Sequence, residues 1–341
     1  MKRDNLKNFI LPVTKIVAFA LVFAILLSIL SVKVFNGENV AKHSERLADS
    51  YSFLKDPEQT VDVAFLGNSD AYSAFNPIAL WEEHGITSSV SASAHQTVEE
   101  CQQALETLTK TQSPKLVVLE VDMLFEGKKI KTDKQANHSK FDYFFDNVAK
   151  PDSFENTITT NFSVFTYHNV WKDLEKDEAR KHTHGFRCYL KKTIVEPEQY
   201  MTVTDETETP TDAILSALKE FMGYCKTNNI PVLFTEVLTM GSWSTPRHNA
   251  VQKLADEYGV DFIDFNFMYD ELGIDMAKAF RDKGHHVNYP TACVITNYIG
   301  SYISEKYGIA DHRNDPKYSD YWDNELKCFK ETYLKDYDMQ L

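Results

Sequence analysis

The chain has 341 residues, of which 43% are hydrophobic and 25% are charged, and its formal net charge is −14. These values are typical of a globular protein with a sizeable core, and they exclude a largely disordered chain. No Lys/Arg-rich run interleaves with aromatic residues, so we expect no nucleic acid partner, and the acidic balance says little about substrate.

The first 35 residues differ from the rest in having a basic start and an uncharged apolar run. The run covers Ile16–Val32 and, with the apolar residues before Lys15, approaches the ~20 residues of a membrane-spanning helix. The basic residues ahead of it predict a single-pass anchor over residues 1–35, with the N-terminus cytoplasmic and the remainder extracytoplasmic. A cleaved signal peptide and a buried helix are the alternatives, but the run exceeds the usual ~7–15-residue apolar core of a signal and no A-x-A site follows.

A polar stretch over residues 36–60 is expected to be a linker, after which β-branched runs alternate with helical patterns. The predicted strands are Val61–Leu66, Ser88–Ala94, Leu116–Val121, Val232–Leu238 and Val260–Phe265. The predicted helices are Thr97–Lys110, Ala213–Cys225, Asn249–Tyr258 and Cys293–Tyr307. Thr97 and Glu100 have capping-box spacing, and Gly259 and Gly308 are natural helix stops.

This alternation predicts a parallel sheet covered by helices on both faces, with ligands bound beyond the carboxyl ends of the strands. We expect one α/β domain over residues 61–310, with a lid or specificity insertion over 123–210 and a C-terminal extension over 311–341. The five cysteines are far apart and lack metal-type spacing, so core packing is their expected role.

Ser69 is the first residue that carries chemistry, because it follows a predicted strand by three residues. It therefore belongs at the carboxyl edge of the sheet, where Gly67 allows a tight turn or a positive φ. A turn or helix starting at Asp70 would direct backbone N–H groups toward the surroundings of the serine oxygen, as half of an oxyanion hole does. Taken alone, Ser69 is more simply a helix cap.

A second group follows the last predicted strand, where Asp282 precedes His285 and His286 by three and four residues. A carboxylate that folds back onto an imidazole fixes its tautomer and stabilises the imidazolium that forms when the histidine takes a serine proton. A surface turn with two solvated histidines is the alternative. Together, a serine after the first strand and an Asp/His loop after the last would meet above one sheet edge, and no metal is implied.

Two further groups are candidates for substrate binding. The first lies after the fourth strand, where an arginine and an aromatic residue are suited to hold a sugar or phosphate, and consists of Trp243, Arg247, His248 and Asn249. The second lies in the insertion and consists of Tyr167, His168 and Trp171. Solvent contacts at a helix start and packing within the insertion are the alternatives.

Four stretches resemble the SGNH/GDSL hydrolase superfamily, in particular its membrane-anchored extracytoplasmic branch of teichoic-acid D-alanylation and polysaccharide O-acetylation proteins. The stretches are FLGNSDAYSAFNPIALW, SPKLVVLEVDML, GSWSTPRHNAVQKLADEYGVDFIDFN and DKGHHVNYPTACVITNYIGSYI. The resemblance covers about residues 61–126 and 212–310. It implies a flavodoxin-like three-layer α/β/α fold with about five parallel strands, preceded by one N-terminal transmembrane helix.

The resemblance also implies roles for the two remote loops. Ser69 would be the nucleophile and Asp282 the orienting acid. The common D-x-x-H pattern selects His285 as the base, whereas the H-V-N form selects His286, which we favour because Asn288 then falls where the family has it.

The chain departs from the soluble esterases because no G-x-N-D block follows the third strand. The oxyanion donors would then be the backbone near Asp70, the backbone of residues 94–96 with His95 and Gln96, or the side chain of Asn68.

From these features we expect a cell-surface O-acyltransferase or esterase that forms an acyl-Ser69 intermediate and needs no cofactor. Its expected partners are an acylated polysaccharide or teichoic-acid-like polymer, a membrane-bound O-acyltransferase, and the membrane itself through the N-terminal helix. The alternatives are an inactive module that binds polymer or a membrane partner, and a phosphoryl or sulfuryl enzyme, for which the chain lacks a clear metal site or basic cluster.

Overall fold

The computed structural model of the chain describes residues 2–33, 46–125, 183–196, 201–335 and 337. The chain divides into two compact units, one of residues 1–44 with 131–177 and the other of residues 45–130 with 178–341. Most of the predicted insertion lies outside the described residues, including Tyr167, His168 and Trp171.

In the first unit, helix α1 covers Lys2–Lys33. Its apolar part, Pro12–Ser31, has 20 residues and a mean hydropathy of 2.6. At 1.5 Å per residue this part is about 30 Å long, the thickness of the hydrocarbon core of a bilayer. The predicted N-terminal apolar helix is therefore confirmed, and its length and composition suit a membrane span and a signal sequence alike.

The second unit is built on a five-stranded sheet. Its strands are β1 (Val63–Gly67), β2 (Ser88–Ala92), β3 (Leu116–Glu120), β4 (Val232–Glu236) and β5 (Phe262–Asp264). All neighbours pair in parallel, in the order β2-β1-β3-β4-β5. This is the strand order of a flavodoxin-like sheet, and its ligand crevice lies outside the carboxyl ends of the strands.

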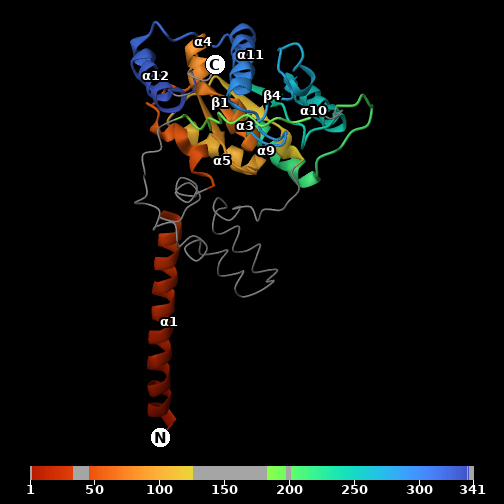
Figure 1. The fold of residues 1–341 in the computed structure, drawn as a ribbon. Helices are drawn as coiled ribbons and strands as arrows, with labels where there is room; N and C mark the ends of the chain where they lie inside the picture. The colour runs from red at the N-terminus through yellow and green to blue at the C-terminus, as the bar shows by residue number, and fades with distance from the viewer. Residues whose placement is uncertain (1, 34–45, 126–182, 197–200, 336, 338–341) are drawn as a thin grey trace. The chain divides into compact units, whose positions relative to one another are not determined.

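Helices cover both faces of this sheet (Figure 1). Their bounds are α3 (Ser69–Ala74), α4 (Pro77–His84), α5 (Val98–Leu108), α9 (Asp212–Thr227), α10 (Thr245–Tyr258), α11 (Tyr289–Tyr307) and α12 (Pro316–Phe329). Helices α3, α4 and α11 pack together on one face, with α12 against α4, whereas α5 packs against α9 on the other. The predicted three-layer α/β/α class is thus confirmed.

Local sequence signals account for several helix ends. The Thr97 hydroxyl accepts the Glu100 N–H and the Glu100 carboxylate accepts the Thr97 N–H, so the predicted capping box forms at the start of α5. Gly259 and Gly308 end α10 and α11 with φ values of +66° and +65°.

Two stretches that we expected outside the main domain pack against it. Residues 48–55 of the predicted linker form a 3₁₀ helix, η1 (Ala48–Lys55), in which Tyr51 and Phe53 are buried. In the predicted C-terminal extension, Trp322 of α12 stacks on Trp81 of α4 with ring centroids 5.9 Å apart. Aromatic burial of this kind stabilises a domain strongly, so both stretches belong to the second compact unit.

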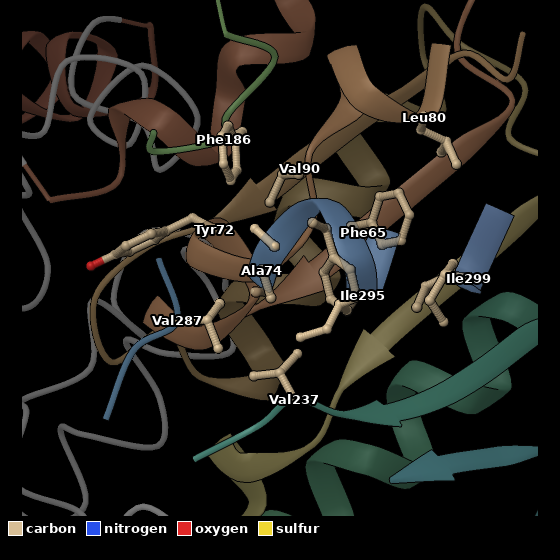
Figure 2. Packing of buried hydrophobic residues seen from close by; sticks show 14 of the residues in the cluster. Phe65, Tyr72, Ala74, Leu80, Val90, Phe186, Val237, Val287, Ile295 and Ile299 are labelled. Carbon is tan, nitrogen blue, oxygen red and sulfur yellow. The ribbon is translucent and has the colours of Figure 1, made fainter. Parts of the chain in front are cut away.

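One apolar core cluster contains residues of α3 and of the loop that carries His286. Val287, which follows His286, lies in one apolar cluster with Tyr72 and Ala74 of α3 and with Val237, which follows β4. Figure 2 shows Val287, Ala74 and Val237 grouped in this core.

Candidate active site

Gly67 ends β1 because no larger residue fits there. A Cβ on Gly67 would lie 2.7 Å from the Cβ atoms of Ala71 and Glu120 and 2.8 Å from Glu120 Oε2. Its φ is not among the positive values of the chain, so close packing rather than left-handed backbone geometry requires the glycine. The tight turn places the half-buried Ser69 at the first position of α3.

Glu120 links the turn after β1 to the turn after β3. This fully buried carboxylate accepts the backbone N–H of Asn68 at 3.2 Å and that of Asp122 at 2.6 Å. Hydrogen bonds to a charged group are about twice as strong as those between neutral groups. Glu120 therefore holds the residue before Ser69 in place, a role that was not expected from its position in the sequence.

Two of the expected oxyanion donors are already engaged. Asn68 Oδ1 accepts the Asp70 N–H at 2.8 Å and so caps α3, while Asn68 Nδ2 donates to Asp122 Oδ2 at 3.3 Å. The turn that carries Ser69 is thus fixed by its own hydrogen bonds. Both donors make hydrogen bonds within the protein in this structure.

The second loop joins Asp282 to His286. The Asp282 carboxylate lies 2.6 Å from His286 Nδ1, and its other oxygen accepts the backbone N–H groups of His285 and His286 at 2.9 and 3.0 Å. An ionised carboxylate only accepts hydrogen bonds, so Nδ1 carries the proton and Nε2 is left as the basic nitrogen. The exposed His285 ring instead lies over Gly241, where a Cβ would be 2.1 Å from it.

This pairing sets the charge state of both groups. Burial raises the pKa of Asp282, but hydrogen bonds from the His286 ring and the two backbone N–H groups outweigh it, so the pKa lies below its ordinary value. Burial lowers the pKa of His286 further than the Asp282 hydrogen bond raises it, and the charge of Arg281 lowers it again. At neutral pH His286 is therefore an uncharged imidazole beside a carboxylate, as a general base must be.

The serine and histidine loops lie at the same edge of the sheet. The Met240 N–H, in the loop after β4, donates to Gly284 O at 2.7 Å, which fixes the histidine loop at the carboxyl ends of the strands. Val287 packs in the same core cluster as Tyr72 of α3, the helix that Ser69 begins. Within the described residues no hydrogen bond joins the Ser69 hydroxyl to either histidine, and such contacts often tighten only when substrate binds.

The residues after β2 do not join this group. Gln96 is buried; its side-chain amide donates to Ser91 O at 2.8 Å and its backbone N–H donates to Ser93 O at 3.1 Å. The Gln96 side chain and its backbone N–H thus both make hydrogen bonds within the protein. His95 is exposed, with a left-handed φ of 52°.

The expected binding group after β4 is largely a packing cluster. Trp243 is buried, and its indole N–H donates to Asp264 Oδ2 at 2.8 Å. The same oxygen lies 2.7 Å from His248 Nδ1. Arg247 binds Glu208 through Nε and Nη2 at 3.1 and 3.0 Å.

The remaining two predicted binding residues hold backbone segments. Asn249 donates to the carbonyls of Thr204 and Glu206 at 2.8 and 2.9 Å. Asn288 caps α11 through Thr291, and its amide donates to Lys278 O at 2.7 Å. Asn288 thus holds the histidine loop against the start of α11.

Acidic side chains gather at the carboxyl ends of the strands. Glu236 ends β4, is fully buried, and has two carboxyl oxygens without a hydrogen-bond partner among the described residues. Burial, together with the charges of neighbouring acids, raises its pKa well above the ordinary value. The sequence signal was available, since β3 and β4 are apolar runs that each end in glutamate.

Comparison with known proteins gives only distant likenesses. No protein-family model matches the chain, and no curated protein matches it. Similar solved structures include a candidate acylhydrolase from Bacteroides fragilis, at 13% identity over 77% of this chain and 97% of that one, with a TM-score of 0.38. A GDSL-like lipase from Bacteroides thetaiotaomicron aligns at 13% identity over 78% and 98%, with a TM-score of 0.35. Likenesses this distant do not establish an activity for this chain.

Proposed function

We propose that the chain is a serine-dependent acyl-transfer enzyme of the cell surface, with Ser69, His286 and Asp282 as its catalytic residues. The observation that carries the proposal is the bonded Asp282–His286 pair at the sheet edge to which β1 delivers Ser69. A base held in one tautomer by a carboxylate near a serine is the arrangement that acyl transfer needs, whatever the fold.

The chemistry proceeds in two steps. Ser69 Oγ attacks the ester carbonyl while His286 Nε2 takes the serine proton, and Asp282 stabilises the resulting imidazolium. His286 then returns that proton to the leaving alcohol as the ester bond breaks, which leaves an acyl group on Ser69. In the second step His286 takes a proton from the incoming hydroxyl as that oxygen attacks the acyl-serine carbonyl. His286 then gives the proton to Ser69 Oγ as the acyl–Ser69 bond breaks.

The incoming hydroxyl decides whether the enzyme is an esterase or a transferase. Water gives hydrolysis, and a polymer hydroxyl gives O-acyl transfer. We favour transfer to an extracellular polysaccharide or teichoic-acid-like polymer. If α1 is an uncleaved anchor, it would keep the site near the extracytoplasmic face of the membrane, where such a polymer lies. A membrane-bound O-acyltransferase is then a natural supplier of acyl groups.

A second candidate is a binding module without turnover, and one observation favours it. The Asp70 N–H and the Asn68 amide, which we expected to stabilise an oxyanion, are bonded to Asn68 Oδ1 and Asp122 instead. An acyl-transfer site needs donors at the oxyanion position, since losing a single one costs about 10²–10³-fold in rate.

Labelling with a serine-reactive fluorophosphonate separates the two candidates. The full-length chain in detergent micelles is labelled and digested, and the modified peptide is identified by mass spectrometry. We expect the label on Ser69 and its loss in Ser69→Ala, whereas the matched control Ser301→Ala, at an exposed serine of α11, keeps it. An unlabelled wild-type chain, or a label that persists in Ser69→Ala, would refute the enzyme and leave the binding module.

A further inference from the structure

The clearest unused group near the candidate site is the guanidinium of Arg281, which directly precedes Asp282. Its Cζ lies 3.6 Å from the centroid of the Tyr189 ring, so the planar group is stacked in a fixed orientation. Its Nε is buried and donates to no described residue, and its contact with Asp282 Oδ2 is 3.7 Å, too long for a hydrogen bond.

The Asp282 carboxylate does not satisfy this guanidinium. Its oxygens already accept from the His286 ring and from the N–H groups of His285 and His286. No hydrogen bond from the Arg281 side chain is formed within the described residues. A partly buried guanidinium with free donors in a fixed fork is suited to a carboxylate or a phosphate, which accepts two parallel bonds.

A second observation comes from the neighbouring segment, residues 187–195. An antiparallel bridge pairs Thr193 with Phe280, which places the backbone of Lys192 beside that of Arg281. The charge of Lys192 also acts on the exposed carboxylate of Asp275. The Thr193 hydroxyl also donates to Arg281 O at 2.7 Å, so the two segments are held together. Two basic residues on adjacent, bonded segments raise the local positive potential that an anionic group would meet.

The charge of the two paired segments differs from that of the whole chain. Residues 187–195 contain three basic residues and no acid, and residues 278–286 contain three basic residues and one acid. Three of the six basic residues lie within ion-pair distance of acids, Arg187 of Asp49, Lys278 of Asp275 and Arg281 of Asp282. In a chain of net charge −14 this local excess of positive charge lies directly beside His286.

We propose that Arg281, with Lys192 on the adjacent segment, forms a subsite that binds an anionic group of the substrate next to His286. The inference rests on the proposed function, because it names the acceptor as a polymer that carries carboxylate or phosphodiester groups. Arg281 supplies the paired hydrogen bonds, and Lys192 supplies charge. The subsite would place a neighbouring acceptor hydroxyl near His286.

Binding to defined oligomers tests the subsite on the full-length chain in detergent micelles. The probes are an oligogalacturonate for carboxylates, an oligo(glycerol phosphate) for phosphodiesters, and maltoheptaose as a neutral control, with dissociation constants from isothermal titration. We expect at least one anionic oligomer to bind about tenfold or more tightly than maltoheptaose, and this preference to fall as salt rises. Which anionic oligomer binds identifies the source of the charge.

The variants assign the effect to Arg281. Arg281→Gln is expected to weaken binding of the preferred anionic oligomer by about tenfold, and Lys192→Gln by about threefold. Lys226→Gln, which removes the same charge at an exposed position on α9, should leave binding unchanged. If Arg281→Gln fails to fold, Arg281→Lys, which keeps the charge but loses the fork, and Lys192→Gln carry the test.

Two outcomes overturn the inference: equal affinity for anionic and neutral oligomers, or equal effects of Arg281→Gln and Lys226→Gln. Failure of the proposed function is distinguishable, because fluorophosphonate labelling of the wild-type chain reports it separately. An unlabelled chain that still binds an anionic oligomer through Arg281 would keep the subsite and refute the acyl chemistry.

Discussion

The turn before Ser69 should not tolerate a single added methyl group. In Gly67→Ala the new Cβ would lie 2.7 Å from the Cβ atoms of Ala71 and Glu120 and 2.8 Å from Glu120 Oε2, so the neighbours must move. Overpacking of a core costs about 1–3 kcal/mol. Displacing Glu120 also weakens its charged hydrogen bond to Asn68, which contributes about 1.5–3 kcal/mol. We therefore expect the free energy of unfolding to fall by about 3–5 kcal/mol.

Urea unfolding of the full-length chain in micelles, followed by tryptophan fluorescence, measures this loss. The matched control is Gly223→Ala, the same change within α9 at a glycine whose added Cβ meets nothing within 4 Å. That control should raise the free energy of unfolding by about 0.5–1 kcal/mol, because alanine favours the helix. A loss of less than about 1 kcal/mol in Gly67→Ala would refute the close-packing explanation of the turn.

Three further predictions concern the candidate catalytic pair and the buried acids. Because the pKa of His286 is lowered and its neutral form is the base, the rate of fluorophosphonate labelling should rise with pH and reach half its maximum below about pH 6.5; a midpoint above that value would contradict the assignment. Asp282→Asn should slow labelling by about 10³–10⁴-fold with little change in fold, since the amide favours the wrong tautomer of His286; a loss below about tenfold would argue against the pair. Glu236 keeps its proton to a higher pH in the folded than in the unfolded chain, so it lowers stability as the pH rises above about 4.3. The stabilisation by Glu236→Gln should therefore grow between pH 5 and pH 8. A difference in melting temperature between the variant and the wild-type chain that stays constant over this range would be inconsistent with a raised pKa.

The fold could be predicted because its signals are local. Apolar runs without alternation mark strands buried on both faces, as in Leu116–Glu120, and capping patterns such as Thr97 with Glu100 mark helix ends. Helix α12 was not predicted, because its burial depends on Trp322 meeting Trp81, a contact between residues far apart in the sequence. Helix α4 was missed although Asn76 and Pro77 are an ordinary start signal.

The candidate site was predictable only in part. The spacing of Asp282 and His286 permits the bond that the structure forms, but spacing alone could not separate His286 from His285. Trp243 is of a residue type suited to binding a sugar, but its indole N–H donates a hydrogen bond to Asp264. The type of a residue indicates which groups its side chain can bind. Which group it does bind depends on which strand ends lie side by side in the folded sheet.

The free donors of Arg281 could not be predicted for the same reason. From the sequence alone, a basic residue next to an Asp–His pair would most simply form an ion pair with the aspartate. Only the geometry shows that Asp282 already accepts three hydrogen bonds from other donors and that Tyr189 stacks on the guanidinium.

The proposed function depends most on Ser69 receiving an acyl group. The full-length chain in micelles, incubated with p-nitrophenyl acetate, quenched in acid and digested, can be searched for acetylated peptides by mass spectrometry. We predict one acetyl group on the peptide that contains Ser69 in the wild-type chain, and none on that peptide in His286→Ala. An unmodified Ser69 in the wild-type chain, or acetylation that is unchanged in His286→Ala, would contradict the proposed acyl chemistry.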